Sequence, residues 1–321
     1  MIIDKKATDS SRFLVRDIYY KNGRSAMYDL LKQMMKSGML DTLYLPAYIG
    51  WSPKEGSGIY DPIIKLSNLK IDFYKITKKI EIDFNDLKKK VVFINTEKTA
   101  VLIVNYFGFY DVNIKKIYDY LKRKGIWIIE DNAHGYYTYM LHRKHFSDAT
   151  FYSFHKLLPY EDGGALRINN PLLHKLSFKG VKDSSSSAKP WLFDSSAIIN
   201  QRRMNYNHLI DVIKHSKSDK YFIPLKPKMT NDTVPQTLPI IIKKGNRDII
   251  YELMNKSGYG VISLYHTMIE PINNEGYKNS QYISKRILNL PVHQDVDTLH
   301  YKSMIKTLIK YCKMTSSPKG V

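Results

Sequence analysis

Two charged side chains stand at the ends of neighbouring apolar runs, and their types suggest chemistry in one crevice. Asp131 follows the run 125–129, and Lys156 follows the run 149–154. Apolar runs that end in polar residues are typical of buried parallel strands, whose carboxyl ends meet at one edge of the sheet. An acid at a strand end can simply cap a turn, and a lysine is commonly a surface residue. A lysine with a lowered pKa in a crevice, however, is a nucleophile for carbonyl groups.

A third feature could bind a phosphate. The turn "NGRSA", residues 22–26, leads into a helical pattern at Arg24–Lys36. The first turn of a helix offers unpaired N–H groups and the positive end of the helix dipole, which attract anions. The turn is neither a P-loop nor a GxGxxG motif, and by itself it indicates no more than an ordinary helix cap.

Taken together, these features suggest one cofactor. Pyridoxal phosphate needs a phosphate site, a carboxylate that keeps the pyridine nitrogen protonated, and a lysine that holds the aldehyde. The chain offers these three in that order. His134, His142 and His155 match no familiar metal-ligand spacing, so we expect no metal.

The elements around these residues predict an α/β fold with a mostly parallel sheet and flanking helices, because strands alternate with helices. We expect helices at residues 24–36, 84–90 and 114–123. We expect strands at residues 43–49, 71–76, 91–94, 100–104, 125–129 and 149–154.

The pattern changes after "KDSSSSAKPW", residues 182–191, which we expect to be a surface loop. A connecting helix is expected at 200–215. Beyond it we expect strands at 237–242 and 259–264 and helices at 247–255 and 297–311. We therefore predict a large domain at 1–205 and a smaller α+β domain at 206–321.

Composition indicates a soluble protein of 321 residues with 43% hydrophobic residues and no apolar run near the roughly 20 residues that cross a membrane. We see no signal peptide. The single Cys312 excludes a disulfide framework, which favours a cytoplasmic location. The net charge of +20 is spread along the chain. It suits phosphorylated ligands better than nucleic acid, for which no motif is present.

The sequence also resembles the DegT/StrS family of sugar-nucleotide aminotransferases, which are pyridoxal phosphate enzymes with the aspartate-aminotransferase fold. The resemblance runs from about Tyr20 to Val296. It rests on "NGRSAMYDLL", "LPAYIGW", "IIEDNAHG", "SDATFYSFHKLLPYEDGGALRIN" and "ISKRILNLPVHQDV". It implies an aspartate-aminotransferase-like large domain with a smaller C-terminal domain, bound pyridoxal phosphate, and a homodimer that builds each site from two subunits.

The position of the family lysine depends on the alignment. The match up to His155 needs no gap, but the family has two more residues before its lysine. Counting back from Gly163, Lys156 falls on that lysine, so we infer a two-residue deletion after His155 and take Lys156 as the cofactor lysine. Without the deletion the position is Leu158. Some family members with histidine at this position act as dehydratases.

The resemblance also implies roles for other residues near the cofactor. Asp131 matches the partner of the pyridine nitrogen. His134 replaces the family glutamine near the phenolic oxygen, and histidine can donate a hydrogen bond there. Ser153 matches a serine near the phosphate, and the amides of Ser25 and Ala26 match the phosphate-binding turn.

Two further roles stay open between candidates. The family completes its phosphate site with an asparagine from the partner subunit, and either Asn200 or Asn205 could serve. The aromatic residue that stacks on the cofactor ring is expected at Gly50, which has no side chain, with Tyr48 and Trp51 nearby.

The resemblance implies transfer of an amino group, from glutamate in most relatives, onto a keto group of a nucleotide-linked sugar in surface-polysaccharide biosynthesis. Lys156 would move the proton, and Asp131 would keep the pyridine nitrogen charged. The alternatives are a sugar dehydratase, an aminotransferase for a non-sugar ketone, or a binder without catalysis. The last is suggested by His134, the two-residue deletion and the short segment before the glycine turn. A nucleic-acid-binding protein would show binding that weakens steeply with salt.

Overall fold

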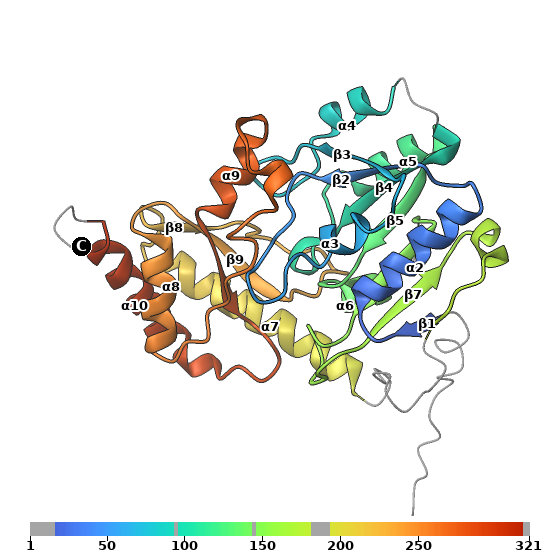
Figure 1. Cartoon of the computed structure of the whole chain (residues 1–321). Helices are drawn as coiled ribbons and strands as arrows, with labels where there is room; N and C mark the ends of the chain where they lie inside the picture. The colour runs from blue at the N-terminus through green and yellow to red at the C-terminus, as the bar shows by residue number, and fades with distance from the viewer. Residues whose placement is uncertain (1–16, 93–95, 143–145, 181–192, 317–321) are drawn as a thin grey trace, which may run out of the picture.

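A seven-stranded sheet forms the middle of the larger part of the molecule (Figure 1). The computed structural model describes residues 17–92, 96–142, 146–180 and 193–316. Neighbouring strands follow the order β1 (Asp17–Tyr20), β7 (Gly164–Ile168), β6 (Ala149–Ser153), β5 (Trp127–Asp131), β4 (Thr99–Val104), β2 (Thr42–Pro46) and β3 (Lys70–Tyr74). The run from β6 to β3 is parallel, and β7 is antiparallel to both β6 and β1. The predicted mostly parallel sheet is confirmed.

Helices cover both faces of this sheet. The helices of this part are α2 (Gly23–Lys36), α3 (Tyr60–Ile63), α4 (Phe84–Lys90), α5 (Ile114–Arg123) and α6 (Tyr136–Leu141). Side chains along β4 alternate between two apolar clusters, as a period of two requires. Leu102 shares its cluster with buried side chains of α2, whereas Val101 and Ile103 pack with those of α5. The strands are therefore buried on both sides.

A smaller antiparallel sheet lies in the C-terminal part of the chain. Its order is β10 (Ile287–Pro291), β9 (Thr237–Ile242) and β8 (Phe222–Pro224). The helices of this part are α7 (Ser195–Lys214), α8 (Arg247–Lys256), α9 (Lys278–Ser284) and α10 (Tyr301–Met314). Figure 1 shows α7, in yellow, running from the large sheet toward the small one. The expected domain boundary at residue 205 falls inside this helix and stays a prediction.

The predicted strand at 259–264 is wrong, and the predicted strand at 91–94 is wrong at its described residues, 91–92. At 91–94, Val91 donates its N–H to Leu87 and ends α4, and its buried side chain packs in the cluster beneath α5. Residues 93–95 lie outside the described part of the chain. At 259–264 only Ile262 makes an isolated bridge, to Asn289. Gly258 and Gly260 both have positive φ there, which bends the backbone away from a strand.

Four strands were not predicted, and they are β1, β7, β8 and β10. Each is short, from three to five residues. The predicted loop at 182–191 lies outside the described residues. Within the described ranges, no helix has both the length and the apolar character needed to cross a bilayer.

Candidate active site

A cleft of about 540 Å³ opens at the carboxyl ends of the parallel strands. The ends of β5 and β6 line it, together with the turn before α2, the loop 49–59 and the loop 263–266. Its size is within the range of small-molecule sites. The two residues singled out at the strand ends, Asp131 and Lys156, both line this cleft.

Asp131 is the last residue of β5 and its side chain is buried. Its Oδ1 accepts a hydrogen bond from the Ala133 amide at 2.7 Å, and none of the described residues donates to its Oδ2. Burial raises the pKa of Asp131, while Lys156 opposes that rise. A buried carboxylate oxygen without a donor is suited to a cationic N–H such as that of a pyridinium ring.

A hydrogen-bond network behind Asp131 holds the strand end in place. The Asn132 amide group donates to Thr150 Oγ1 at 2.8 Å and to Glu130 Oε2 at 3.1 Å. Its carbonyl oxygen accepts from Asn105 at 2.9 Å. Because the Asn132 side chain is fully buried, these bonds fix the backbone on which Asp131 is carried.

Lys156 and His134 form a hydrogen-bonded pair in the cleft. The Nζ of Lys156 lies 2.9 Å from Nε2 of His134. The Phe107 amide donates to Nδ1 of the same ring at 3.3 Å, so the proton of the neutral imidazole is on Nε2. Burial lowers the pKa of His134 well below its usual range and also lowers the pKa of Lys156. With its proton on Nε2, the His134 ring donates to Lys156 when that amine is uncharged, and the uncharged amine is the nucleophilic form.

The turn before α2 reaches the cleft with different residues from those expected. Asn22, Gly23 and Arg24 line the cleft, whereas the amide of Ser25 already donates to Asn22 Oδ1 at 3.0 Å. The amide of Ala26 donates to the Asn22 carbonyl at 3.3 Å. A phosphate at this turn would meet the Gly23 and Arg24 end of the helix first, and the Asn22 side chain would have to move before Ser25 could bind it.

Of the other predicted residues, some line the cleft and some lie outside it. Ser153 lines the cleft, with its Oγ 3.2 Å from His155 Nδ1. Trp51 lies at the rim with 41% of its surface exposed, and Tyr48 is fully buried outside the lining. Leu158 is buried in an apolar cluster, so Lys156 is the residue of the two that faces the cleft.

The two candidate asparagines lie on α7 and neither lines the cleft of this chain. Asn205 is buried, donates to His293 and accepts from Gln201. Asn200 is exposed. Of the two side chains, only that of Asn200 is accessible to a partner subunit without breaking bonds within the chain.

Among the lining residues that sequence reasoning missed are Arg24, Glu55 and Tyr265. Arg24 lies in the turn already recognised, and its guanidinium donates to the Glu55 carbonyl at 3.4 Å. Tyr265 enters from the C-terminal part of the chain. No local pattern around residue 265 marks it, because its position depends on how distant segments pair.

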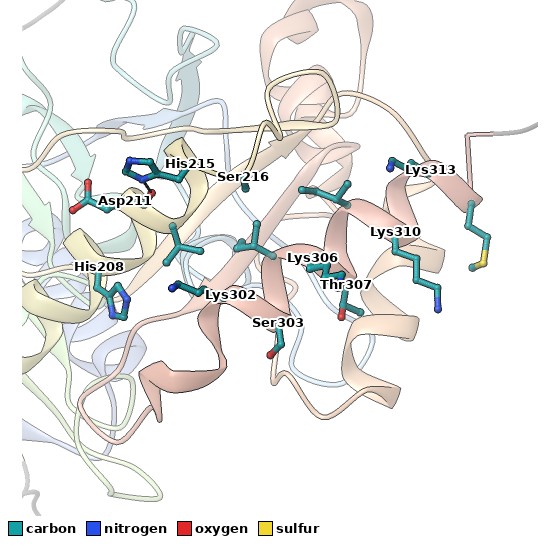
Figure 2. A pocket seen from close by; sticks show the side chains of 14 residues that line it. His208, Asp211, His215, Ser216, Lys302, Ser303, Lys306, Thr307, Lys310 and Lys313 are labelled. Atoms are coloured by element: carbon teal, nitrogen blue, oxygen red, sulfur yellow. Dashed lines mark hydrogen bonds between the residues drawn. The ribbon is translucent and has the colours of Figure 1, made fainter.

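A larger hollow of about 1350 Å³ lies elsewhere, between α7 and α10 (Figure 2). Lys302, Lys306, Lys310 and Lys313 project along α10, and Asp211 is the only acid among the described residues of the lining. Neither Asp131 nor Lys156 lines this hollow, so its size does not make it the reactive site. Among the described residues no group of three or more histidine, cysteine or acidic side chains could hold a metal ion.

Residues 66–189 match the DegT/DnrJ/EryC1/StrS aminotransferase family, so the resemblance read from the motifs is confirmed. The chain is similar to PseC of Helicobacter pylori, an aminotransferase involved in the biosynthesis of pseudoaminic acid. The two share 17% identity and a TM-score of 0.71, over 92% of this chain and 86% of that chain. None of the curated protein sequences matches the chain significantly.

Two more solved structures are similar. A putative sugar aminotransferase of Streptococcus pneumoniae in its PLP form has 14% identity and a TM-score of 0.69, over 94% of this chain and 88% of that chain. The GDP-4-keto-6-deoxy-D-mannose-3-dehydratase of E. coli, with bound hydrated PLP, has 18% identity and a TM-score of 0.69, over 92% and 87%. At such identities the similarity establishes the fold, which is that of the aspartate-aminotransferase-like enzymes the motifs implied.

Proposed function

This chain carries the DegT/DnrJ/EryC1/StrS aminotransferase match over residues 66–189, and on that premise we propose that it is a pyridoxal-phosphate-dependent aminotransferase. It moves an amino group from a donor such as glutamate onto a keto group of a nucleotide-linked sugar. The observation that carries this proposal is that Asp131 and Lys156, both inside the matched segment, line one cleft.

The residues present fit pyridoxal phosphate. Asp131 offers Oδ2 to the pyridine N–H, Lys156 offers an amine to the aldehyde, and the turn at Gly23 and Arg24 offers a helix N-terminus to the phosphate. The Nε2–H of His134, fixed by the Phe107 amide, is a donor for the phenolic oxygen. When bound, the cofactor supplies an electron sink for carbanion chemistry.

The chain's own residues would then handle the proton. The Nζ of Lys156 is the base that takes a proton from the substrate carbon, and burial lowers the pKa of this amine, which favours the uncharged form that a base needs. Asp131 stays charged when it faces a cation, because a neighbouring positive charge offsets the effect of burial. His134 remains neutral and therefore acts as a donor that orients, without taking the proton itself.

A nucleotide-linked sugar is the substrate class that fits the similar proteins. Of the three similar structures, one is named a putative sugar aminotransferase, one an aminotransferase in the biosynthesis of pseudoaminic acid, and the third a dehydratase of a GDP-linked deoxymannose. Arg24 at the mouth of the cleft is suited to a diphosphate. A dehydratase is the second candidate. Lys156 favours the aminotransferase, because some family members with histidine at the position of the cofactor lysine act as dehydratases.

Isotope-labelled glutamate separates these functions. The protein is loaded with pyridoxal phosphate and given labelled glutamate and a nucleotide-linked keto sugar, and the products are read by mass spectrometry. Label in the sugar product supports the aminotransferase, with Lys156→Ala as the inactive control. Loss of a hydroxyl without label identifies a dehydratase. The glutamate carries the label in its amino nitrogen; if the sugar stays unlabelled, but a non-sugar keto acid supplied in its place is converted to a labelled amine, the protein is an aminotransferase of another substrate class.

We also propose that the enzyme is a cytoplasmic homodimer that acts in surface-polysaccharide biosynthesis. The exposed Asn200 on α7 supports a role for the partner subunit, because an asparagine there could reach a neighbouring phosphate site. Analytical ultracentrifugation checks the dimer. If Asn200 completes the partner's site, Asn200→Ala weakens cofactor binding in the dimer without changing the mass.

A further inference from the structure

We propose that Tyr265 is the aromatic side chain that packs against the cofactor ring in this protein. The proposal rests on the proposed function and assigns a role that the family resemblance placed near residue 50. Tyr265 comes from the C-terminal part of the chain and lines the same cleft as Asp131 and Lys156.

The place expected to carry the stacking side chain is already filled. A Cβ at Gly50 would lie 3.1 Å from Cδ1 of Tyr265 and 3.6 Å from both its Cα and its Cε1. Any larger side chain at residue 50 would therefore collide with the Tyr265 ring. The absence of a side chain at Gly50 leaves room for the Tyr265 ring, which reaches the cleft from a distant segment of the chain.

Backbone pairing fixes the segment that carries Tyr265. The amide of Trp51 donates to the Thr267 carbonyl at 3.0 Å, and the amide of Ile269 donates to the Ile49 carbonyl at 3.1 Å. Tyr265 itself has a φ of 57°, a conformation that is costly for any residue other than glycine. Backbone strain of this kind persists where the surroundings demand it and is concentrated at functional sites.

The Tyr265 ring is held among other aromatic rings. It stacks on the fully buried Tyr48, with centroids 5.2 Å apart and planes 24° apart. Tyr106 and Phe107 meet it edge-on at 5.3 and 5.8 Å, and the His134 ring lies 5.7 Å away. A rigid aromatic side chain that lines a cleft beside the lysine and the carboxylate is suited to a flat heteroaromatic ligand. Tyr48 supports that ring from behind.

The test is the dissociation constant of pyridoxal phosphate, measured by equilibrium titration of its absorbance with wild type, Tyr265→Phe and Tyr265→Leu. Phenylalanine keeps the ring and leucine keeps much of the apolar bulk. We expect binding within about twofold of wild type for Tyr265→Phe and about tenfold weaker for Tyr265→Leu. Thermal unfolding of each variant shows whether it is folded.

Moving the aromatic ring from residue 265 to residue 50 separates the loss of ring stacking from the loss of packing around residue 265. Tyr265→Gly removes the ring and suits the positive φ, and Gly50→Phe in the same chain places a ring where the tyrosine had blocked one. We expect Tyr265→Gly alone to bind weakly and the double variant to regain affinity. Equal affinity for wild type, Tyr265→Leu and Tyr265→Gly, all folded, overturns the proposal for Tyr265. If wild type itself does not bind pyridoxal phosphate, the proposed function fails instead.

Discussion

Two adjacent carboxylates at the end of β5 have different surroundings and different tasks. Asp131 faces the cleft, whereas Glu130 is buried among Asn132, Ser147 and Thr150. Burial raises the pKa of Glu130 to about 7, because the donors to its Oε2 only partly compensate for lost hydration. Glu130 therefore holds a proton in the folded protein at a pH where it has lost it in the unfolded chain.

This difference makes stability depend on pH. The contribution from protonated Glu130 is complete below its ordinary pKa of 4.5 and is lost as pH rises through about 7. Over that window the free energy of unfolding falls by about 3 kcal/mol from this group alone. The glutamine side chain in Glu130→Gln still accepts a hydrogen bond from Asn132 but does not titrate. We therefore expect this variant to lack the part of the pH-dependent fall in the free energy of unfolding that comes from Glu130. Urea unfolding of both proteins at several pH values measures it, and parallel curves would contradict the prediction.

At the scale of residues, the sequence allowed prediction of the pair at the strand ends but not of their neighbours. Asp131 and Lys156 follow apolar runs, and the geometry of a parallel sheet brings such ends together. Tyr265 is invisible to that reasoning, since its place depends on pairing with residues 49–51, more than two hundred positions earlier. The Asn22 bond to Ser25 also needed coordinates, because a helix cap and a phosphate site share one sequence pattern.

At the scale of elements, the backbone of β7 lies against the turn before α2 at Gly164. A Cβ at Gly164 would lie 2.3 Å from the carbonyl carbon of Asn22 and 2.4 Å from the Gly23 nitrogen. Because Gly164 has no side chain, the N-terminus of α2 can approach β7 and reach the cleft beside Ser153.

We therefore expect Gly164→Ala to be destabilising by about 3 kcal/mol and to weaken pyridoxal phosphate binding, because the backbone of the turn must shift. Gly38→Ala is the matched control. Gly38 has a φ of 72° and nothing within 4 Å of its would-be Cβ, so its replacement costs only about 1 kcal/mol of backbone strain. Chemical unfolding and cofactor titration compare the two. Equal losses in both variants would contradict the close packing inferred at Gly164.

Elements were predictable where periodicity and length agreed. The amphipathic helices α2, α5 and α10 and the apolar strands β4, β5, β6 and β9 match their patterns. The errors have a common cause, because Val91 is buried in an apolar cluster and Ile262 makes one isolated bridge, and neither belongs to a ladder of paired strands. Short strands such as β1 and β8 are defined by their partners and carry too few residues for a pattern.

At the scale of the whole molecule, one buried arginine links the cofactor lysine to the C-terminal part. Arg202 of α7 donates to the Leu157 carbonyl at 3.3 Å, next to Lys156, and to Gln294 Oε1 at 2.9 Å. It also donates to the carbonyls of Pro235 and Gln236, each at 3.3 Å. Burial lowers the pKa of Arg202 to about 10, which leaves the side chain charged at neutral pH.

Replacing this side chain with methionine leaves several buried acceptors without a donor. We expect Arg202→Met to lose about 3 kcal/mol or more of stability and to bind pyridoxal phosphate less tightly. Arg203→Met is the control on the same helix. Arg203 also donates to three carbonyls, but it is only partly buried, so water can replace it at lower cost. Similar losses from both replacements would argue against a linking role for Arg202.

The central claim is that Lys156 is the residue that holds pyridoxal phosphate in the cleft with Asp131. The most direct measurement is reduction of the loaded protein with borohydride, followed by peptide mass spectrometry. The account predicts one reduced pyridoxyl phosphate group, on Lys156 and on no other lysine, and none in Lys156→Ala. A group on another lysine, or labelling unchanged in the variant, would contradict the account.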